Sequence, residues 1–214
     1  MGGEDLIPSC REAFSLKVDS KEQAIFVAEY DGRKLFRCDM AGGSRVDLFD
    51  GFKEGGYIPM AMDLDQRDRV VYLYCMDDWS NPLHHVVFRV PYDEGKGKPE
   101  LFMELGTKAA DIIIDSRRRK IYWFAVTNVG RVWCEDAQIE AAGNEFWCAG
   151  LKTPEKRTLL IGTEKGIRAV SRAVFDPTRE EVYWTQRDAG WENDKVRRSD
   201  VRGKNIKDIA WNAS

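Results

Sequence analysis

Apolar and polar residues alternate along short stretches of this chain. Four of these stretches end at an aspartate. Apolar residues two positions apart precede the aspartate, for example Leu16 and Val18, or Ile112 and Ile114. This period of two is typical of a strand with one buried face. Seven positions after the aspartate comes an aromatic residue, in the pairs Asp19–Phe26, Asp65–Tyr72, Asp115–Tyr122 and Asp176–Tyr183. Each copy therefore predicts two strands joined by a polar turn.

The aspartate itself fits the first position of that turn. Its short carboxylate can accept hydrogen bonds from backbone N–H groups two or three residues further on. β-branched and aromatic residues such as Val70, Val71 and Tyr72 then resume after the turn, and these suit a pleated surface. We therefore interpret the four aspartates as turn residues rather than as a metal site or an acid/base pair.

Two more strand-like stretches follow each hairpin, which gives four repeats over residues 14–50, 60–105, 109–162 and 170–211. In the third repeat two alternatives stay open for the third strand. It is either 131–134, or 145–148 with residues 130–143 as an insertion that contains a helix at 135–142, and we favour the insertion. The left-over residues 6–10 are expected to lie over the last repeat. Repeats of 40 to 60 residues indicate a β-propeller, so we expect one all-β domain over residues 1–214.

Two of the repeats resemble a known family. Tyr183-Trp184-Thr185 after Asp176-Pro177, and Tyr122-Trp123 after Asp115, resemble the YWTD (class B) repeats of low-density-lipoprotein receptors. The resemblance implies a β-propeller of four-stranded blades. The family's final aspartate is absent in all four copies, where Glu29, Cys75, Ala125 and Gln186 stand.

The number of blades remains open at this point. Family members usually close with six blades, but four repeats are countable here. The chain forms a closed four-bladed ring, or part of a larger ring completed by another chain, or is a fragment. We expect a monomer or a homodimer accordingly.

The net charge and the cysteine content limit the classes of binding partner and the cellular compartment that we expect. The formal net charge is −3, which argues against nucleic acid, and the basic run 117–120 falls in a repeat turn, where we expect a solvated tip. No apolar run has transmembrane length, and no secretory signal is visible at the N-terminus. The five cysteines contain no C-x-x-C motif. We therefore expect a cytoplasmic protein with reduced cysteines, no membrane partner and no cofactor.

The loops on the side opposite to the aspartate turns are longer and carry aromatic residues. Rigid aromatic side chains beside a few charges suit a binding surface. We expect a small molecule or a protein to bind there, and the candidate ligand-binding residues are Tyr57, Trp79, Trp133, Arg168 and Trp191. The aspartate turns are short and charged, and we expect no pocket beside them.

The alternative function is a cofactor-independent enzyme, a cyclase, isomerase or hydrolase acting on an apolar metabolite in an axial pocket. His84, His85 and Asp111 are its weak catalytic candidates, and Asp77, Asp78 and Asp188 could supply oxygen ligands to a cation. Neighbouring strand residues point to opposite faces, so His84 and His85 are not expected to share a metal. No nucleophile elbow, phosphate loop or dinucleotide motif is present, and the sequence leaves open whether the protein is an enzyme.

Overall fold

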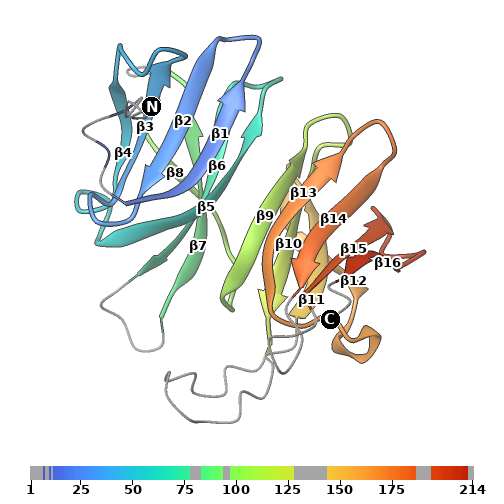
Figure 1. Ribbon diagram of the computed structural model, residues 1–214. Coiled ribbons are helices and arrows are strands. Elements are labelled where there is room, and N and C mark those ends of the chain that lie inside the picture. Colours follow the sequence, from blue (N-terminus) through green and yellow to red (C-terminus); the bar gives the residue numbers. More distant parts are fainter. Residues whose placement is uncertain are drawn as a thin grey trace, which may run out of the picture. The chain divides into compact units, whose positions relative to one another are not determined.

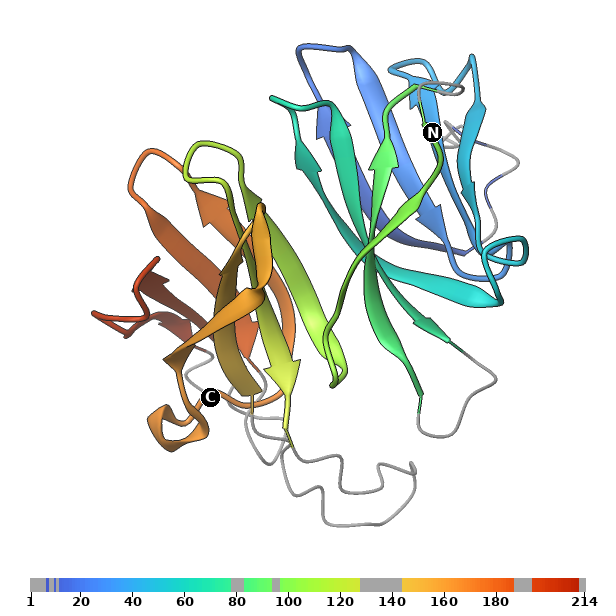
Figure 2. The same cartoon turned by 180° about the vertical axis from the view of Figure 1, so that it is seen from behind.

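The computed structural model describes residues 7, 10, 12–77, 83–93, 97–127, 144–186 and 194–211 of the 214 residues. Within these ranges the chain forms sixteen strands and one short 3-10 helix, η1 (Thr163–Lys165) (Figures 1 and 2). The strands make four antiparallel sheets of four, each in chain order. These are the blades of a β-propeller, so the predicted fold class is correct. None of the helical residues described is part of a segment long and apolar enough to cross a membrane.

Contacts divide the chain into two compact units, residues 1–106 and residues 107–214. Unit 1 contains two blades. The strands of the first blade are β1 (Ala13–Asp19), β2 (Ala24–Glu29), β3 (Lys34–Asp39) and β4 (Val46–Asp50). Those of the second blade are β5 (Tyr57–Asp65), β6 (Val70–Asp77), β7 (His85–Pro91) and β8 (Glu100–Glu104).

Unit 2 contains the other two blades. The third blade consists of β9 (Ala109–Asp115), β10 (Lys120–Val126), β11 (Asn144–Gly150) and β12 (Thr153–Ile161). The fourth consists of β13 (Val170–Asp176), β14 (Glu181–Gln186), β15 (Lys195–Asp200) and β16 (Lys207–Trp211). Since β11 begins at Asn144, the favoured choice of third strand is confirmed. The stretches 131–134 and 135–142 lie outside the described residues.

The four turn aspartates behave as the sequence predicted. In Asp19, Asp65, Asp115 and Asp176 one carboxylate oxygen accepts the N–H groups two and three residues on, at 2.8 to 3.4 Å. The residue four after each aspartate has a positive φ of 51 to 58°, at Gln23, Arg69, Arg119 and Glu180. Because none of these is glycine, the left-handed residue that closes the turn was not visible in the sequence.

Each blade has two faces, which we name by the residues after the turn. The forward face carries the aromatic residue seven positions after the aspartate, and the rear face carries the next residue, such as Val27 or Leu73. In unit 1 the forward face of the first blade packs on the rear face of the second, through Phe26 and Leu35 against Leu73 and Cys75. In unit 2 the forward face of the third blade packs on the rear face of the fourth in the same way, through Tyr122, Phe124 and Phe146 against Val182 and Trp184.

The first strands of successive blades lie side by side at both junctions. β1 contacts β5 in unit 1, and β9 contacts β13 in unit 2. The buried cores of the two units are therefore the blade junctions themselves, and the loops project from both ends of the strands (Figure 1).

Ile7 and Cys10 pack against the rear face of the first blade, on Ile25, Val27, Phe36 and Cys38. One expectation requires correction. The basic run 117–120 is only partly a solvated tip. Arg117 is exposed, but Arg118 donates to the buried carboxylate of Asp115 at 2.9 Å and pairs with Glu180 of the next blade.

Candidate functional site

A tyrosine, an aspartate and a histidine gather at the loop end of the second blade. Tyr57 opens β5 and stands opposite Asp77, the last residue of β6. The Asp77 N–H donates to the His84 carbonyl at 3.0 Å, so the chain returns beside Asp77 just before β7. The Nδ1 atom of His84 lies 3.9 Å from a carboxylate oxygen of Asp77. We call these three residues the loop-side cluster.

Packing and charge define the state of the cluster. The Tyr57 ring meets Phe88 edge to face at 5.1 Å between centroids, which holds it on the rear face of the blade. Burial raises the pKa of Tyr57, and the nearby charge of Asp77 raises it further, so the hydroxyl remains a hydrogen-bond donor. The Asp77 side chain keeps 13 % of its surface and that of His84 keeps 58 %. The cluster thus presents a donor, an acceptor carboxylate and an accessible imidazole.

His85 belongs to the other face of the same sheet. Its Nδ1 atom lies 2.9 Å from the hydroxyl of Tyr74, which is buried. His84 and His85 therefore have separate partners on opposite faces, as the strand alternation predicted. In the part of the chain that the structure describes, no three His, Cys, Asp or Glu side chains are grouped to hold a metal ion.

The remaining candidates that the structure describes lie in unit 2. Arg168 is exposed on the segment between η1 and β13. Asp111 is buried in β9, where one carboxylate oxygen accepts the N–H of Ile112 and the other accepts the N–H of Ala173, both at 2.9 Å. Because Ala173 lies on β13, Asp111 ties the third blade to the fourth. Trp79, Trp133, Trp191, Asp78 and Asp188 fall outside the described residues.

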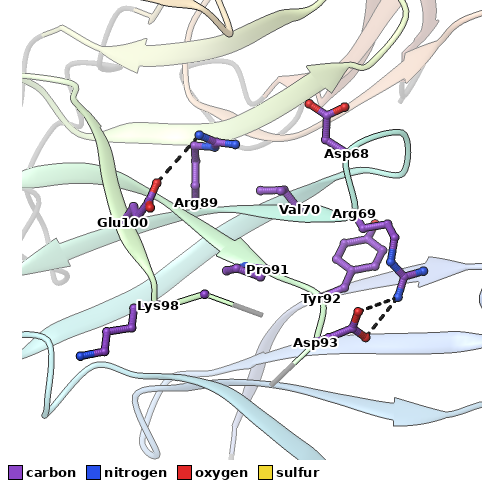
Figure 3. A pocket seen from close by; sticks show the side chains of 10 residues that line it. Asp68, Arg69, Val70, Arg89, Pro91, Tyr92, Asp93, Lys98 and Glu100 are labelled. Atoms are coloured by element: carbon purple, nitrogen blue, oxygen red, sulfur yellow. Dashed lines mark hydrogen bonds and ion pairs between the residues drawn. The ribbon is translucent and has the colours of Figure 1, made fainter. Parts of the chain in front are cut away.

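A cleft that the sequence did not predict lies on the turn side of the second blade (Figure 3). It has a volume of about 450 Å³ between the β5–β6 turn and the segment that joins β7 to β8. Its lining residues include Asp68, Arg69, Arg89, Tyr92, Asp93 and Glu100. The expectation of no pocket beside these turns is therefore wrong for this turn. The number of residues between Val90 and Leu101 was the signal that could have indicated it, and Pro91, Asp93 and Lys98 from this stretch line the cleft.

The charges of this cleft largely neutralise one another. Arg69 donates to both carboxylate oxygens of Asp93 at 3.1 Å, and its guanidinium lies 5.5 Å from the centre of the Tyr92 ring. Arg89 lies 3.9 Å from Glu100 (Figure 3). Burial raises the pKa of Tyr92, as does the charge of Asp19, so this hydroxyl stays protonated. Arg69 with Asp93 and Arg89 with Glu100 are thus paired within the blade.

Comparisons with known proteins concern the fold alone. No family model and no curated protein matches the sequence. Among solved structures, the nidogen/laminin complex matches with a TM-score of 0.65 and 18% identity, over 89% of this chain and 62% of that one. Oligogalacturonate lyase in complex with manganese matches with a TM-score of 0.61 and 10% identity, over 93% of this chain and 53% of that one. The tricorn protease matches with a TM-score of 0.51 and 10% identity, over 92% of this chain and 26% of that one.

These structural likenesses support a β-propeller fold. The resemblance to YWTD repeats rests on the sequence motif. The nidogen structure is a YWTD β-propeller. At such identities the likeness shows the fold and no shared activity. This chain spans less than two thirds of each of the three matched chains.

Proposed function

We propose that this protein is a binding module, and that it holds a small molecule or a protein partner at the loop-side cluster of Tyr57, Asp77 and His84. The observation that carries the proposal is the register of the second blade. It sets Tyr57 directly opposite Asp77, with His84 next to Asp77 at the same end of the sheet. Side chains from three successive segments of the blade therefore converge on one rigid edge, which is where propeller loops carry their sites.

The chemistry of the cluster favours a partner with an apolar group beside a hydrogen-bond donor or a positive charge. The Tyr57 ring offers flat contact area, and the Asp77 carboxylate accepts hydrogen bonds. Leu83, directly before His84, keeps 47% of its surface and adds an apolar contact. By sequence, Trp79 belongs to the loop that leaves Asp77, and Trp133, Arg168 and Trp191 are further candidates on their own loops.

The compartment and the family are parts of the same proposal. We infer a cytoplasmic protein of the YWTD type. The four cysteines that the structure describes, Cys10, Cys38, Cys75 and Cys148, are free thiols, which supports a reducing compartment. The Tyr183-Trp184-Thr185 motif supports the kinship.

The proposal can be tested with a library of small aromatic, cationic and carboxylate fragments, followed by amide chemical shifts. We expect bound fragments to shift the amides of Tyr57, Asp77 and His84. His84→Ala should weaken their binding about fivefold, since the exposed imidazole contacts the ligand and contributes about 1 kcal/mol. Met40→Ala is the matched control, because Met40 is 44% exposed in the same unit and follows β3 at the opposite end of the strands from the cluster. Fragments that bind only the cleft around Arg89 and Tyr92, with His84→Ala unaffected, would contradict the proposal.

A second candidate function rests on the distance between Asp77 and His84. A carboxylate 3.9 Å from an imidazole nitrogen can orient a histidine that acts as a general base. In that case the protein is a cofactor-independent hydrolase or isomerase. Loss of turnover in His84→Ala with unchanged ligand affinity would favour the enzyme over the binding module.

A further inference from the structure

The turn-side cleft of the second blade contains two arginines in different environments. Arg69 donates to both carboxylate oxygens of Asp93 at 3.1 Å and also pairs with Glu22. Arg89 lies 3.9 Å from a carboxylate oxygen of Glu100, which is longer than a hydrogen bond. The Nε atom of Arg89 is buried and has no hydrogen-bond partner among the described residues. Arg69 is therefore held firmly by the protein, whereas Arg89 keeps a buried donor without an acceptor.

Two other blades have an arginine at the same repeat position, and each of those arginines has a close acidic partner. Arg37, Arg89 and Arg198 stand opposite the aromatic residue seven positions after the turn aspartate. Arg37 pairs with Asp93 of the next blade at 3.0 Å, and Arg198 pairs with Glu181 of its own blade. The repeat thus offers two places from which an acid can neutralise this arginine.

For Arg89 the sequence has no acid at either of these places. Val70 occupies the position of Glu181, five residues after the turn aspartate. Lys152 of the third blade occupies the position of Asp93, since each follows the third strand of its blade by two residues. A lysine would repel Arg89 rather than neutralise it. Both replacements are features of the sequence, so the repeat itself supplies no acid to Arg89.

A buried N–H group without an acceptor is unfavourable, which makes the Nε atom of Arg89 a feature that needs an explanation. Arg89 lines the cleft of about 450 Å³ (Figure 3). A guanidinium carries its donors in a fixed fork that matches two oxygens of a carboxylate or a phosphate. An anionic group bound in the cleft would therefore supply the missing acceptor.

The charges along the cleft select the kind of anion. The charged lining residues are three acids and three bases, namely Asp68, Asp93, Glu100, Arg69, Arg89 and Lys98. A phosphate with two negative charges would be repelled by the acids. A single carboxylate with a positive group beside it matches a lining whose charges balance. The side chain of Glu100 keeps 72% of its surface and lies next to Arg89, so it can accept that positive group (Figure 3).

The size and the apolar lining of the cleft indicate a compact molecule. Val70 and Pro91 line it between the charged side chains (Figure 3). Its volume is near the lower end of the range of about 300 to 1,000 Å³ that is typical of small-molecule pockets. The cleft therefore has room for a small ligand with one apolar side chain.

We propose that the turn-side cleft of the second blade binds a small zwitterion of the α-amino-acid class, with its carboxylate on Arg89 and its ammonium group on Glu100. The carboxylate accepts from the Nε atom and from a terminal N–H of Arg89. The apolar side chain of the ligand lies on Val70 and Pro91. Glu100 turns from Arg89 to the ammonium group, and this change costs little because the exposed pair at 3.9 Å is weak.

Calorimetric titration of the full chain with the common α-amino acids tests the class of ligand. We expect an amino acid with an apolar side chain, such as leucine, to bind. N-acetylleucine lacks the ammonium group and leucinamide lacks the carboxylate, so each should bind at least about fivefold more weakly than leucine. A panel in which no amino acid binds at about 10 mM overturns the proposal. Leucinamide that binds as tightly as leucine overturns it as well.

Variants of the two charged residues test the roles assigned to them. Arg89→Gln should weaken leucine binding at least about tenfold, and Arg89→Lys should restore only part of it, since lysine keeps the charge but not the fork. Glu100→Gln should lower the affinity for leucine to that for N-acetylleucine, and N-acetylleucine itself should bind no more weakly than before. Because Glu100 is exposed, this second variant is expected to keep the melting temperature.

Arg67→Gln is the matched control, because Arg67 is exposed on the same turn and is not among the residues that line the cleft. It should leave leucine binding unchanged. Unaltered leucine affinity in Arg89→Gln would contradict the proposal.

Amide chemical shifts separate this cleft from the loop-side cluster. Bound leucine should shift the amides of Val70, Arg89 and Glu100, and His84→Ala should leave its affinity unchanged. Shifts confined to the loop-side cluster would exclude the cleft as the amino-acid site. The two sites are thus tested by different ligands and different variants.

Discussion

The blade junctions of the two units share their apolar packing and a turn ion pair, Glu22 with Arg69 and Arg118 with Glu180, but differ in their other polar contacts. In unit 1 the junction is crossed by ion pairs between side chains, Lys17 with Asp63 at 3.1 Å and Arg37 with Asp93 at 3.0 Å. In unit 2 it is crossed by buried side chains that bond to the backbone. Asp111 accepts the Ala173 N–H at 2.9 Å, and Asn144 accepts the Val170 N–H at 3.0 Å.

The difference shows that the repeat defines the packing of apolar residues but not the polar contacts around it. Partly exposed ion pairs add little to the free energy of unfolding, because water also solvates both charges in the unfolded chain. A buried backbone N–H that loses its acceptor pays the full cost of desolvation. We therefore expect unit 2 to tolerate loss of its polar links less well than unit 1.

The largest effect is expected from Asp111→Ala. The change leaves the N–H groups of Ile112 and Ala173 without the carboxylate and should lower the free energy of unfolding by about 3 kcal/mol. Lys17→Ala, the matched change in unit 1, should lower it by about 1 kcal/mol or less. Urea unfolding of both variants measures the contrast, and equal losses would show that the two junctions do not differ in this way.

An intermediate effect is expected from the turn pair of unit 2. Arg118→Glu sets a carboxylate beside Asp115, which is 2% exposed, and beside Glu180, and should cost about 2 kcal/mol. The double change Arg118→Glu with Glu180→Arg copies the order of charges in unit 1, where Glu22 follows Asp19 and pairs with Arg69. It should recover at least half of the loss in thermal unfolding. A double variant no more stable than Arg118→Glu would mean that the pair is not interchangeable between the units.

The smallest effect concerns acid. Burial opposes ionisation of Asp47, but Lys34 and Arg45 outweigh it and hold the pKa of this carboxyl below its usual range. A lowered folded pKa stabilises the protein above about pH 4, and this contribution is lost as the pH falls through the folded value. Asp47→Asn should therefore reduce stability at pH 6 by less than about 1 kcal/mol and have no effect at pH 2. A loss that persists at pH 2 would exclude the charge as its cause.

The candidate site was predictable only in part. The alternation of strand residues was enough to separate His84 from His85 and to locate Tyr57 and Asp77 at the loop end. It did not bring Tyr57, Asp77 and His84 together, because that depends on the register of β5 on β6 and on the return of the chain before β7. The cleft on the turn side was missed because its wall combines a turn with a segment about twenty residues further on.

The sequence by itself determined the blades. Period-two alternation, a turn aspartate and a β-branched run are local features, and each acts over fewer than about ten residues. They define the four hairpins, the outward and inward side of each strand, and the structural role of Asp19, Asp65, Asp115 and Asp176. Hydrogen bonds between neighbouring residues do not depend on the rest of the chain, so they can be predicted from the local sequence.

Only the tertiary structure decided what holds one blade to the next. Glu29 pairs with Arg45 of its own blade, and Gln186 donates to the carbonyl of Gly166, which precedes the fourth blade. Neither partner was evident from the sequence. Asp111, a weak catalytic candidate from the sequence, accepts the N–H of Ala173 in the next blade. Arg118, which was expected to be solvent-exposed, pairs with Glu180 of the next blade. The contacts of a polar side chain across a junction depend on the distance and burial that packing creates, and these are absent from the order of residues.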